Sequence, residues 1–139
     1  MPQGKKNIVT GLLVMSGFMA YGFLLIYLRD FAPDKAAWIA DYADGKHFEA
    51  RLAHVHGNLF ALLNIMIGYL VLRLPISAFS ARWVSWLGIL GLLMPLGILA
   101  EFTLGAPPYF VLIGGIAMLA SIAWLGLAIW KSNIPLTNA

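Results

Sequence analysis

The chain has 139 residues, of which 61% are hydrophobic and 11% are charged, so its composition excludes an ordinary water-soluble domain with about 25% charged residues. It contains no cysteine, which excludes disulfides, thiolate metal sites, iron–sulfur clusters and cysteine nucleophiles. The nine Lys and Arg residues are scattered, so the formal net charge of +3 indicates basic membrane loops and no nucleic-acid partner.

Four long apolar segments predict helices that cross a lipid bilayer, which takes roughly 20 residues each. The segments cover about 8–28, 52–72, 83–104 and 107–130. They do not alternate every second residue, as the strands of a membrane barrel would. We therefore predict an all-α integral membrane protein in which residues 1–139 form one bundle of four transmembrane helices. The first segment is too long for a signal peptide and is expected to remain.

The loops between these segments predict an orientation. One side of the membrane collects basic residues without any acid, namely Lys5, Lys6, Arg73, Arg82 and Lys131. The positive-inside rule then predicts that both termini lie in the cytoplasm. We expect the helices to lie in the inner membrane of a bacterium. The outer loop 29–51 carries Trp38 and Tyr42 among its charges, which predicts a short amphipathic helix on the membrane surface. We expect His47 in this loop to be solvated.

The second segment begins with a group of polar side chains, in the run Arg51-Leu52-Ala53-His54-Val55-His56-Gly57-Asn58. An ionisable group in hydrocarbon is costly, so His54 is a functional candidate. A helix turns about 100° per residue, so Asn58 shares a side with His54 and His56 points elsewhere. Small residues form a stripe that predicts close helix contact: Ala53, Gly57, Ala61, Asn64 and Gly68. This stripe also predicts a homo-oligomer.

The third segment carries Pro95, which predicts a kink, and Glu101 near its end. Tyr27 ends the first segment and Tyr109 begins the fourth, so both are expected at the depth of His54 and Glu101. All four helices would then contribute a polar group to one layer near the outer surface. This predicted layer is the candidate site.

Simpler roles remain open for the same residues. His54 can form a structural hydrogen bond to Glu101 or to a backbone carbonyl, and His56 can lie among the lipid headgroups. Asn58 and Asn64 can join helices, and Glu101 can reach water.

The chemistry of such a site is limited by what the sequence lacks. There is no glycine-rich phosphate loop with lysine and no G-x-S-x-G turn, which excludes nucleotide enzymes and α/β-type hydrolases. One imidazole with a carboxyl group and amides nearby suits an axial haem ligand or a single metal ion. His54 is the predicted ligand, His56 and Tyr109 are further cofactor contacts, and the candidate catalytic residues are Asn58, Asn64 and Glu101.

The Arg51-Leu52-Ala53-His54 segment, in a four-span chain with a small-residue stripe and a basic cytoplasmic end, resembles the membrane-bound styrene oxide isomerase family. The resemblance implies haem b at a subunit interface with His54 as ligand. The ferric iron would act as a Lewis acid that turns a small hydrophobic epoxide into an aldehyde by a 1,2-shift. Asn58 or Asn64 would orient the substrate. They follow His54 by four and ten residues, whereas the family asparagine follows its histidine by six.

Two other functions fit the sequence. The chain can be a non-catalytic accessory or assembly subunit whose polar residues only join helices, which predicts a colourless and metal-free protein. It can also be a sensor that binds a small hydrophobic ligand in the outer leaflet without turning it over.

Overall fold

A computed structural model describes residues 3–132, and every regular element within that range is an α-helix. The helices are α1 (Gln3–Asp30), α2 (Lys35–Ala40), α3 (Lys46–Arg73), α4 (Ala78–Gly91), α5 (Leu93–Leu104) and α6 (Tyr109–Lys131). Four helical stretches are long and apolar enough to cross a membrane: α1, α3, the stretch Ala78–Leu104 that joins α4 to α5, and α6. This confirms the all-helical fold and the four long apolar helices that the sequence predicts.

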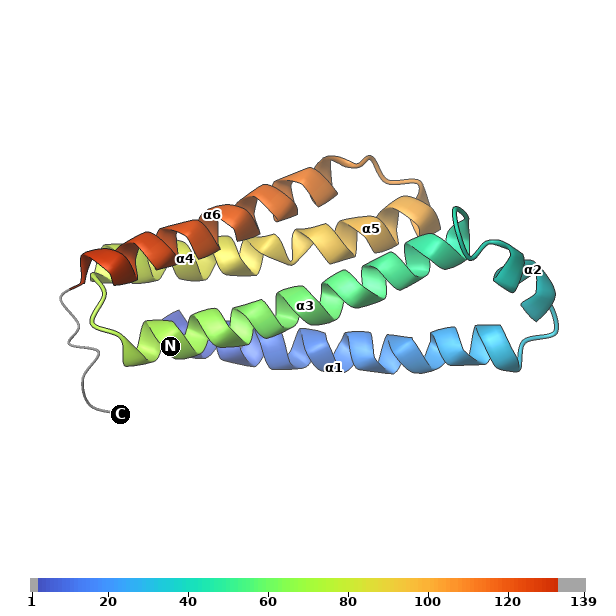
Figure 1. The fold of residues 1–139 in the computed structure, drawn as a ribbon, viewed down its shortest axis with the longest axis horizontal. Coiled ribbons are helices and arrows are strands. Elements are labelled where there is room, and N and C mark those ends of the chain that lie inside the picture. The colour runs from blue at the N-terminus through green and yellow to red at the C-terminus, as the bar shows by residue number, and fades with distance from the viewer. Residues whose placement is uncertain (1–2, 133–139) are drawn as a thin grey trace.

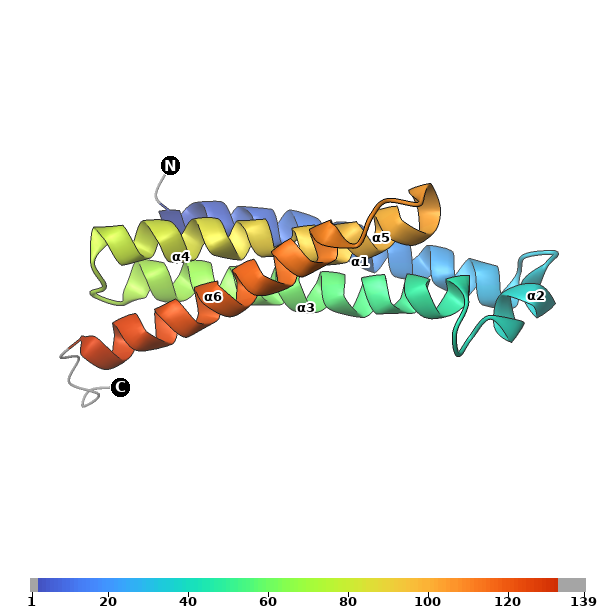
Figure 2. The same cartoon turned by 90° about the horizontal axis from the view of Figure 1, so that it is seen from above.

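The helices lie side by side as two antiparallel pairs (Figure 1). Helix α1 packs along α3, while α6 packs along α4 and α5 and crosses the other helices obliquely (Figure 2). Helix α2 lies at one end of the bundle, which we call the α2 end. Helix α1 begins and α6 ends at the opposite end, which we call the N-terminal end (Figure 1).

Two helices extend beyond the apolar segments from which they were predicted. Helix α3 begins at Lys46, where the sequence indicated a span only from about residue 52, and α1 begins at Gln3 before the first apolar residue. Lysine, glutamine and glutamate are good helix formers, so the helices continue into their polar flanks. The predicted loop 29–51 therefore contains the beginning of α3 as well as the short helix α2.

Helices α1 and α3 meet along stripes of small and polar residues. The buried residues of α1 are Gly4, Asn7, Gly11 and Phe18, spaced by three, four and seven as in a packed helix pair. The predicted stripe of α3 is buried along its whole length. At the N-terminal end, a Cβ atom on Gly4 or on Gly68 would collide with the backbone oxygen of the other residue, so only glycine permits this approach.

The third long helix is interrupted at Leu92, between α4 and α5. Pro95 follows three residues later and has no N–H to donate to the carbonyl oxygen of Gly91. The backbone N–H of Leu92 donates to the backbone oxygen of Ile89, over 3.0 Å. This partner lies three residues earlier, and not four as in a regular α-helix. The interruption lies about one turn before Pro95, in the region where the sequence predicts a kink.

Large apolar side chains cover the outside of the bundle. Phe23 is 74% exposed and Trp130 is 81% exposed, whereas Asn7 and Asn64 are fully buried. A protein surrounded by water rarely exposes apolar surface on this scale. The core itself is formed by Phe60, Ile67, Val84, Leu92, Met118 and Leu125.

Candidate functional site

His54 lies on α3 with its imidazole ring against α1. Its Nδ1 atom is buried and makes no hydrogen bond with any described residue. Its Nε2 atom is not enclosed in this way and is likewise free of hydrogen bonds within the described range. The ring of Tyr21 lies 6.2 Å away, centroid to centroid. His54 therefore presents a histidine nitrogen that the protein itself does not use.

Gly22 of α1 makes room for this ring. A Cβ atom placed on Gly22 would lie 2.7 Å from Cε1 of His54 and 3.4 Å from Nε2. Carbon atoms in contact prefer about 3.5–4.0 Å, so any side chain at this position would push the imidazole away. Among the twenty residue types, only glycine leaves the observed position of the His54 ring open.

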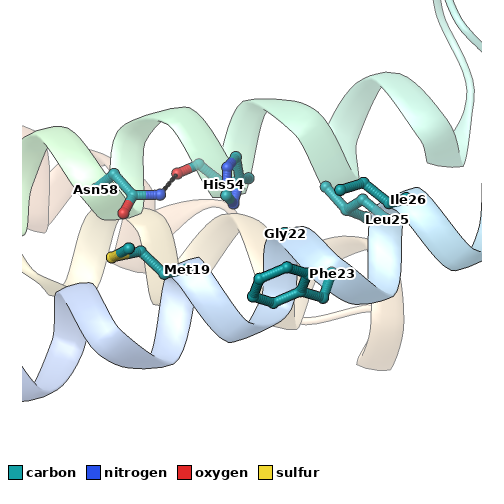
Figure 3. A pocket seen from close by; sticks show the side chains of 7 residues that line it. All are labelled: Met19, Gly22, Phe23, Leu25, Ile26, His54 and Asn58. Atoms are coloured by element: carbon teal, nitrogen blue, oxygen red, sulfur yellow. Dashed lines mark hydrogen bonds between the residues drawn. The ribbon is translucent and has the colours of Figure 1, made fainter.

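A pocket of about 460 Å³ lies beside the imidazole. Its lining is apolar except for His54 and Asn58: Met19, Gly22, Phe23, Leu25, Ile26, His54 and Asn58. The α1 residues face the two polar side chains of α3 across the pocket (Figure 3). Because Phe23 and Ile26 are also exposed on the outside of the bundle, the pocket opens sideways. We call it the lateral pocket.

Asn58 shares the lateral pocket with His54, as their spacing of four residues predicts. Its amide nitrogen donates a hydrogen bond of 2.9 Å to the backbone oxygen of His54. The side-chain oxygen points toward Met19 (Figure 3). Asn58 thus offers the pocket a hydrogen-bond acceptor, and its amide nitrogen keeps a second N–H that the bond to His54 does not use.

His56 points to a different side of α3. Its Nδ1 lies 2.9 Å from the backbone oxygen of Leu52, and since a carbonyl only accepts, Nδ1 must carry the proton. The ring lies 6.2 Å from that of Phe60, which belongs to the core. The predicted divergence of the two histidines agrees with this arrangement, and His56 does not line the lateral pocket.

The remaining groups of the predicted polar layer are not joined to His54. Glu101 is exposed on α5, Tyr109 is 66% exposed and Tyr27 is 51% exposed. None of them forms a hydrogen bond or an ion pair with His54 within residues 3–132.

A different polar layer joins the four long helices, nearer the N-terminal end. Asn7 of α1 donates to Oδ1 of Asn64 and to the backbone oxygen of Ser85, each over 2.9 Å. Asn64 of α3 donates to the backbone oxygen of Gly88 in α4, over 2.8 Å. Ser121 of α6 donates to the backbone oxygen of Val84. Asn64 is fully buried here and does not line the lateral pocket. Besides its two interhelical bonds it donates to the backbone oxygen of Phe60 in its own helix, over 3.0 Å.

His47 is buried, at 4% exposure, which corrects the expectation that it is solvated. Its ring stacks on Trp38 at 4.8 Å and meets the ring of Tyr42 at 5.2 Å. Its Nδ1 donates a 3.0 Å hydrogen bond to the backbone oxygen of Trp38. Helix α2 folds back over the beginning of α3, and this covers the histidine.

Among the described residues, the site offers one imidazole within apolar walls and no further ligands for a bare metal ion. Within residues 3–132, no cluster of three His, Asp or Glu side chains could hold a metal. The lateral pocket offers one imidazole with an accessible nitrogen and otherwise apolar walls. A haem needs an axial imidazole and apolar surroundings for its faces, and the donor set matches that demand.

Sequence reasoning identified His54 and Asn58 but missed the α1 wall of the pocket. Met19, Gly22, Phe23, Leu25 and Ile26 are apolar or glycine and give no chemical signal of their own. Asn7, the partner of Asn64, was also missed. Its spacing from Gly4 and Gly11 matches the small-residue stripe of α3 and could have indicated a packed position.

No protein-family model, curated protein or solved structure matches the chain.

Proposed function

We propose that this chain is an integral membrane protein that binds haem b in the lateral pocket through His54 and isomerises a small hydrophobic epoxide to an aldehyde. The observation that carries the proposal is the imidazole of His54, which lies against Gly22 and whose nitrogens have no hydrogen-bond partner among residues 3–132. Nδ1 is buried and Nε2 is accessible, so a ligand of this imidazole would bind at Nε2.

The apolar exterior supports a membrane location, and the acid-free basic loops support cytoplasmic termini in a bacterial inner membrane. The lateral pocket then opens toward lipid or toward a second copy of the chain. A small hydrophobic substrate dissolved in the bilayer can enter it without crossing water. Because α1 buries little of its surface, a homo-oligomer that covers the pocket fits the same geometry.

When bound, a ferric haem supplies a Lewis acid toward an epoxide oxygen. His54 would hold the group from α3, while Phe23 and Met19 would exclude water from the apolar walls. The product is an isomer of the substrate: one carbon–oxygen bond breaks and a hydride moves to the neighbouring carbon. Asn58 would offer its amide oxygen as an acceptor and its second N–H as a donor to the epoxide oxygen.

The test is an assay of the purified protein with styrene oxide, in mild detergent and without added oxidant or reductant. We expect the corresponding aldehyde to form, and the His54→Ala variant to lose more than about 100-fold in rate, because it lacks the ligand itself and the loss of a ligand's outer partner alone costs about 10–100-fold. The His56→Ala variant is the matched control and should retain activity. Absence of aldehyde from protein that carries haem would contradict the isomerase assignment.

A second candidate function is a non-catalytic subunit, favoured by the polar layer of Asn7, Asn64, Ser85 and Ser121. These buried groups are satisfied within the chain and act as links between helices. This alternative predicts a colourless protein that co-purifies with a partner, with His54→Ala changing stability or partner binding only.

A further inference from the structure

A second pocket of about 210 Å³ adjoins the lateral pocket at the α2 end. It is lined by Leu25, Ile26, Arg29, Tyr42, His47 and Arg51. Leu25 and Ile26 line both pockets, so the two spaces follow each other along α1. The lining changes from apolar around Phe23 to cationic around Arg51 within this short distance. A ligand that fills both would have one apolar part and one polar end.

Residues 29–51 at the α2 end carry four basic and five acidic side chains, but the two charged residues that line this pocket, Arg29 and Arg51, are both basic. Arg29 forms an ion pair of 2.8 Å with Asp30, which is the one ion pair among the described residues. Arg51 therefore has no carboxylate partner within residues 3–132. No acidic side chain lines this pocket. An anion is the ligand that such a lining attracts.

Arg51 is held in place by an aromatic cluster. Its guanidinium carbon lies 3.9 Å from the centre of the Tyr42 ring. Tyr42 in turn meets the buried ring of His47, and His47 stacks on Trp38. The hydrogen bond from His47 to the Trp38 backbone ties this cluster to α2. A guanidinium whose position is fixed in advance loses less freedom when it binds an anion.

We propose that the two adjoining pockets bind an acidic amphiphile. Its carboxylate or phosphate lies against Arg51, and its apolar body lies between Met19 and Phe23 in the lateral pocket. The inference rests on the proposed function in one respect, since both place a ligand in the lateral pocket. The acidic amphiphile would lie between the same apolar walls that the proposed function assigns to haem, so the two proposals are tested separately. Arg29, already paired with Asp30, contributes less than Arg51.

The test compares oleate with oleyl alcohol, which has the same chain and no charge, by calorimetric titration of the protein in a neutral detergent. Protein from cells grown with and without a haem precursor is titrated in parallel. We expect oleate to bind about tenfold more tightly than the alcohol, with an advantage that shrinks as salt is raised. Arg51→Gln should remove this advantage, and Arg51→Lys should keep most of it.

Arg73→Gln is the matched control, because Arg73 also lies over a tyrosine ring, that of Tyr69 at 5.9 Å, but lines neither pocket. It should leave the binding of oleate unchanged. Equal binding of oleate and the alcohol in both preparations, or an unchanged oleate affinity in Arg51→Gln, overturns the inference.

Two further measurements on the same samples are informative. One distinguishes a membrane lipid from a free acid as the ligand, and the other distinguishes this inference from the haem proposal. If phosphatidylglycerol displaces oleate, the acidic ligand is a membrane lipid; if it does not, the ligand is a free acid, and both results support the site at Arg51. Arg51-dependent oleate binding without a haem absorption band supports this inference and contradicts the haem proposal. A haem band that depends on His54, without Arg51-dependent binding of oleate, does the reverse.

Discussion

At the scale of single residues, the position of His54 depends on one absent methyl group. Gly22 lets the imidazole lie against the α1 backbone, and any Cβ there would come within 2.7 Å of the ring. The same helix carries Gly17, where an added Cβ would meet nothing within 4 Å. The two glycines are five residues apart on one helix, but only at Gly22 would an added Cβ meet another side chain.

Gly22→Ala should therefore displace the ring of His54 and weaken or shift the absorption band of the haem that we propose it binds. Gly17→Ala should leave the visible spectrum unchanged. Alanine favours the helix by about 1 kcal/mol over glycine at either position, so a loss in Gly22→Ala cannot come from a weaker helix. The measurement is the visible spectrum of the two variants at equal protein concentration. Identical spectra would show that the ring does not depend on Gly22.

The two asparagines of α3 have different partners and should differ in their effect on stability. Asn64→Ala removes links to Asn7 and to Gly88, and we expect it to lower the free energy of unfolding by about 1–2 kcal/mol. Asn58→Ala removes only a bond to its own helix and should cost less than about 0.5 kcal/mol. Denaturant unfolding in detergent measures both. Equal losses would contradict the assignment of Asn64 as an interhelical link.

At the scale of helices, the pairing of α1 with α3 follows from the spacing of small residues. The stripe on α3 was predictable because Ala53, Gly57 and Gly68 recur on one face in sequence. Which helix covers that face was not predictable, since spacing does not reveal the order of helices around a bundle. For the same reason the sequence did not predict that α1 residues line the lateral pocket, since these residues are apolar or glycine.

Helix α2 shows how a loop that looks polar can bury a histidine. The sequence predicted the short helix but not its contact with α3, because that contact depends on the stacking of Trp38 on His47 across nine residues. The stacked pair fixes α2 over the beginning of α3.

Trp38→Ala should release α2 and expose the chain between Asp30 and Lys46 to protease. We expect limited digestion with trypsin to cut at Lys35 or Lys46 several times faster than in the unmodified protein, because local unfolding precedes cleavage. Trp130→Ala, which removes an indole that is 81% exposed, is the control and should digest at the original rate. Unchanged digestion of Trp38→Ala would mean that other contacts hold α2.

At the scale of the whole molecule, the sequence predicted the four long helices because the thickness of a bilayer sets their length. The hydrogen bonds that join all four long helices involve Asn7, Asn64, Ser85 and Ser121, and of these residues the sequence predicted only Asn64 as a link between helices. Serine residues in apolar helices bond readily to backbone oxygens, so Ser85 and Ser121 gave no distinct signal.

The orientation of the molecule can be tested with single cysteines, because the chain has none of its own. A membrane-impermeant maleimide should label Asp44→Cys in intact bacterial cells and Lys131→Cys only after the cells are permeabilised. Both positions are exposed and lie at opposite ends of the bundle. The reverse labelling pattern would place the α2 end, and with it the polar end of the site, in the cytoplasm.

The visible absorption spectrum of protein purified from cells supplied with a haem precursor tests the central claim most directly. We predict a Soret band in the unmodified protein and in His56→Ala, since His56 points away from the lateral pocket, and its loss in His54→Ala. A band that survives His54→Ala, or a protein without any band, would contradict the assignment of His54 as the haem ligand.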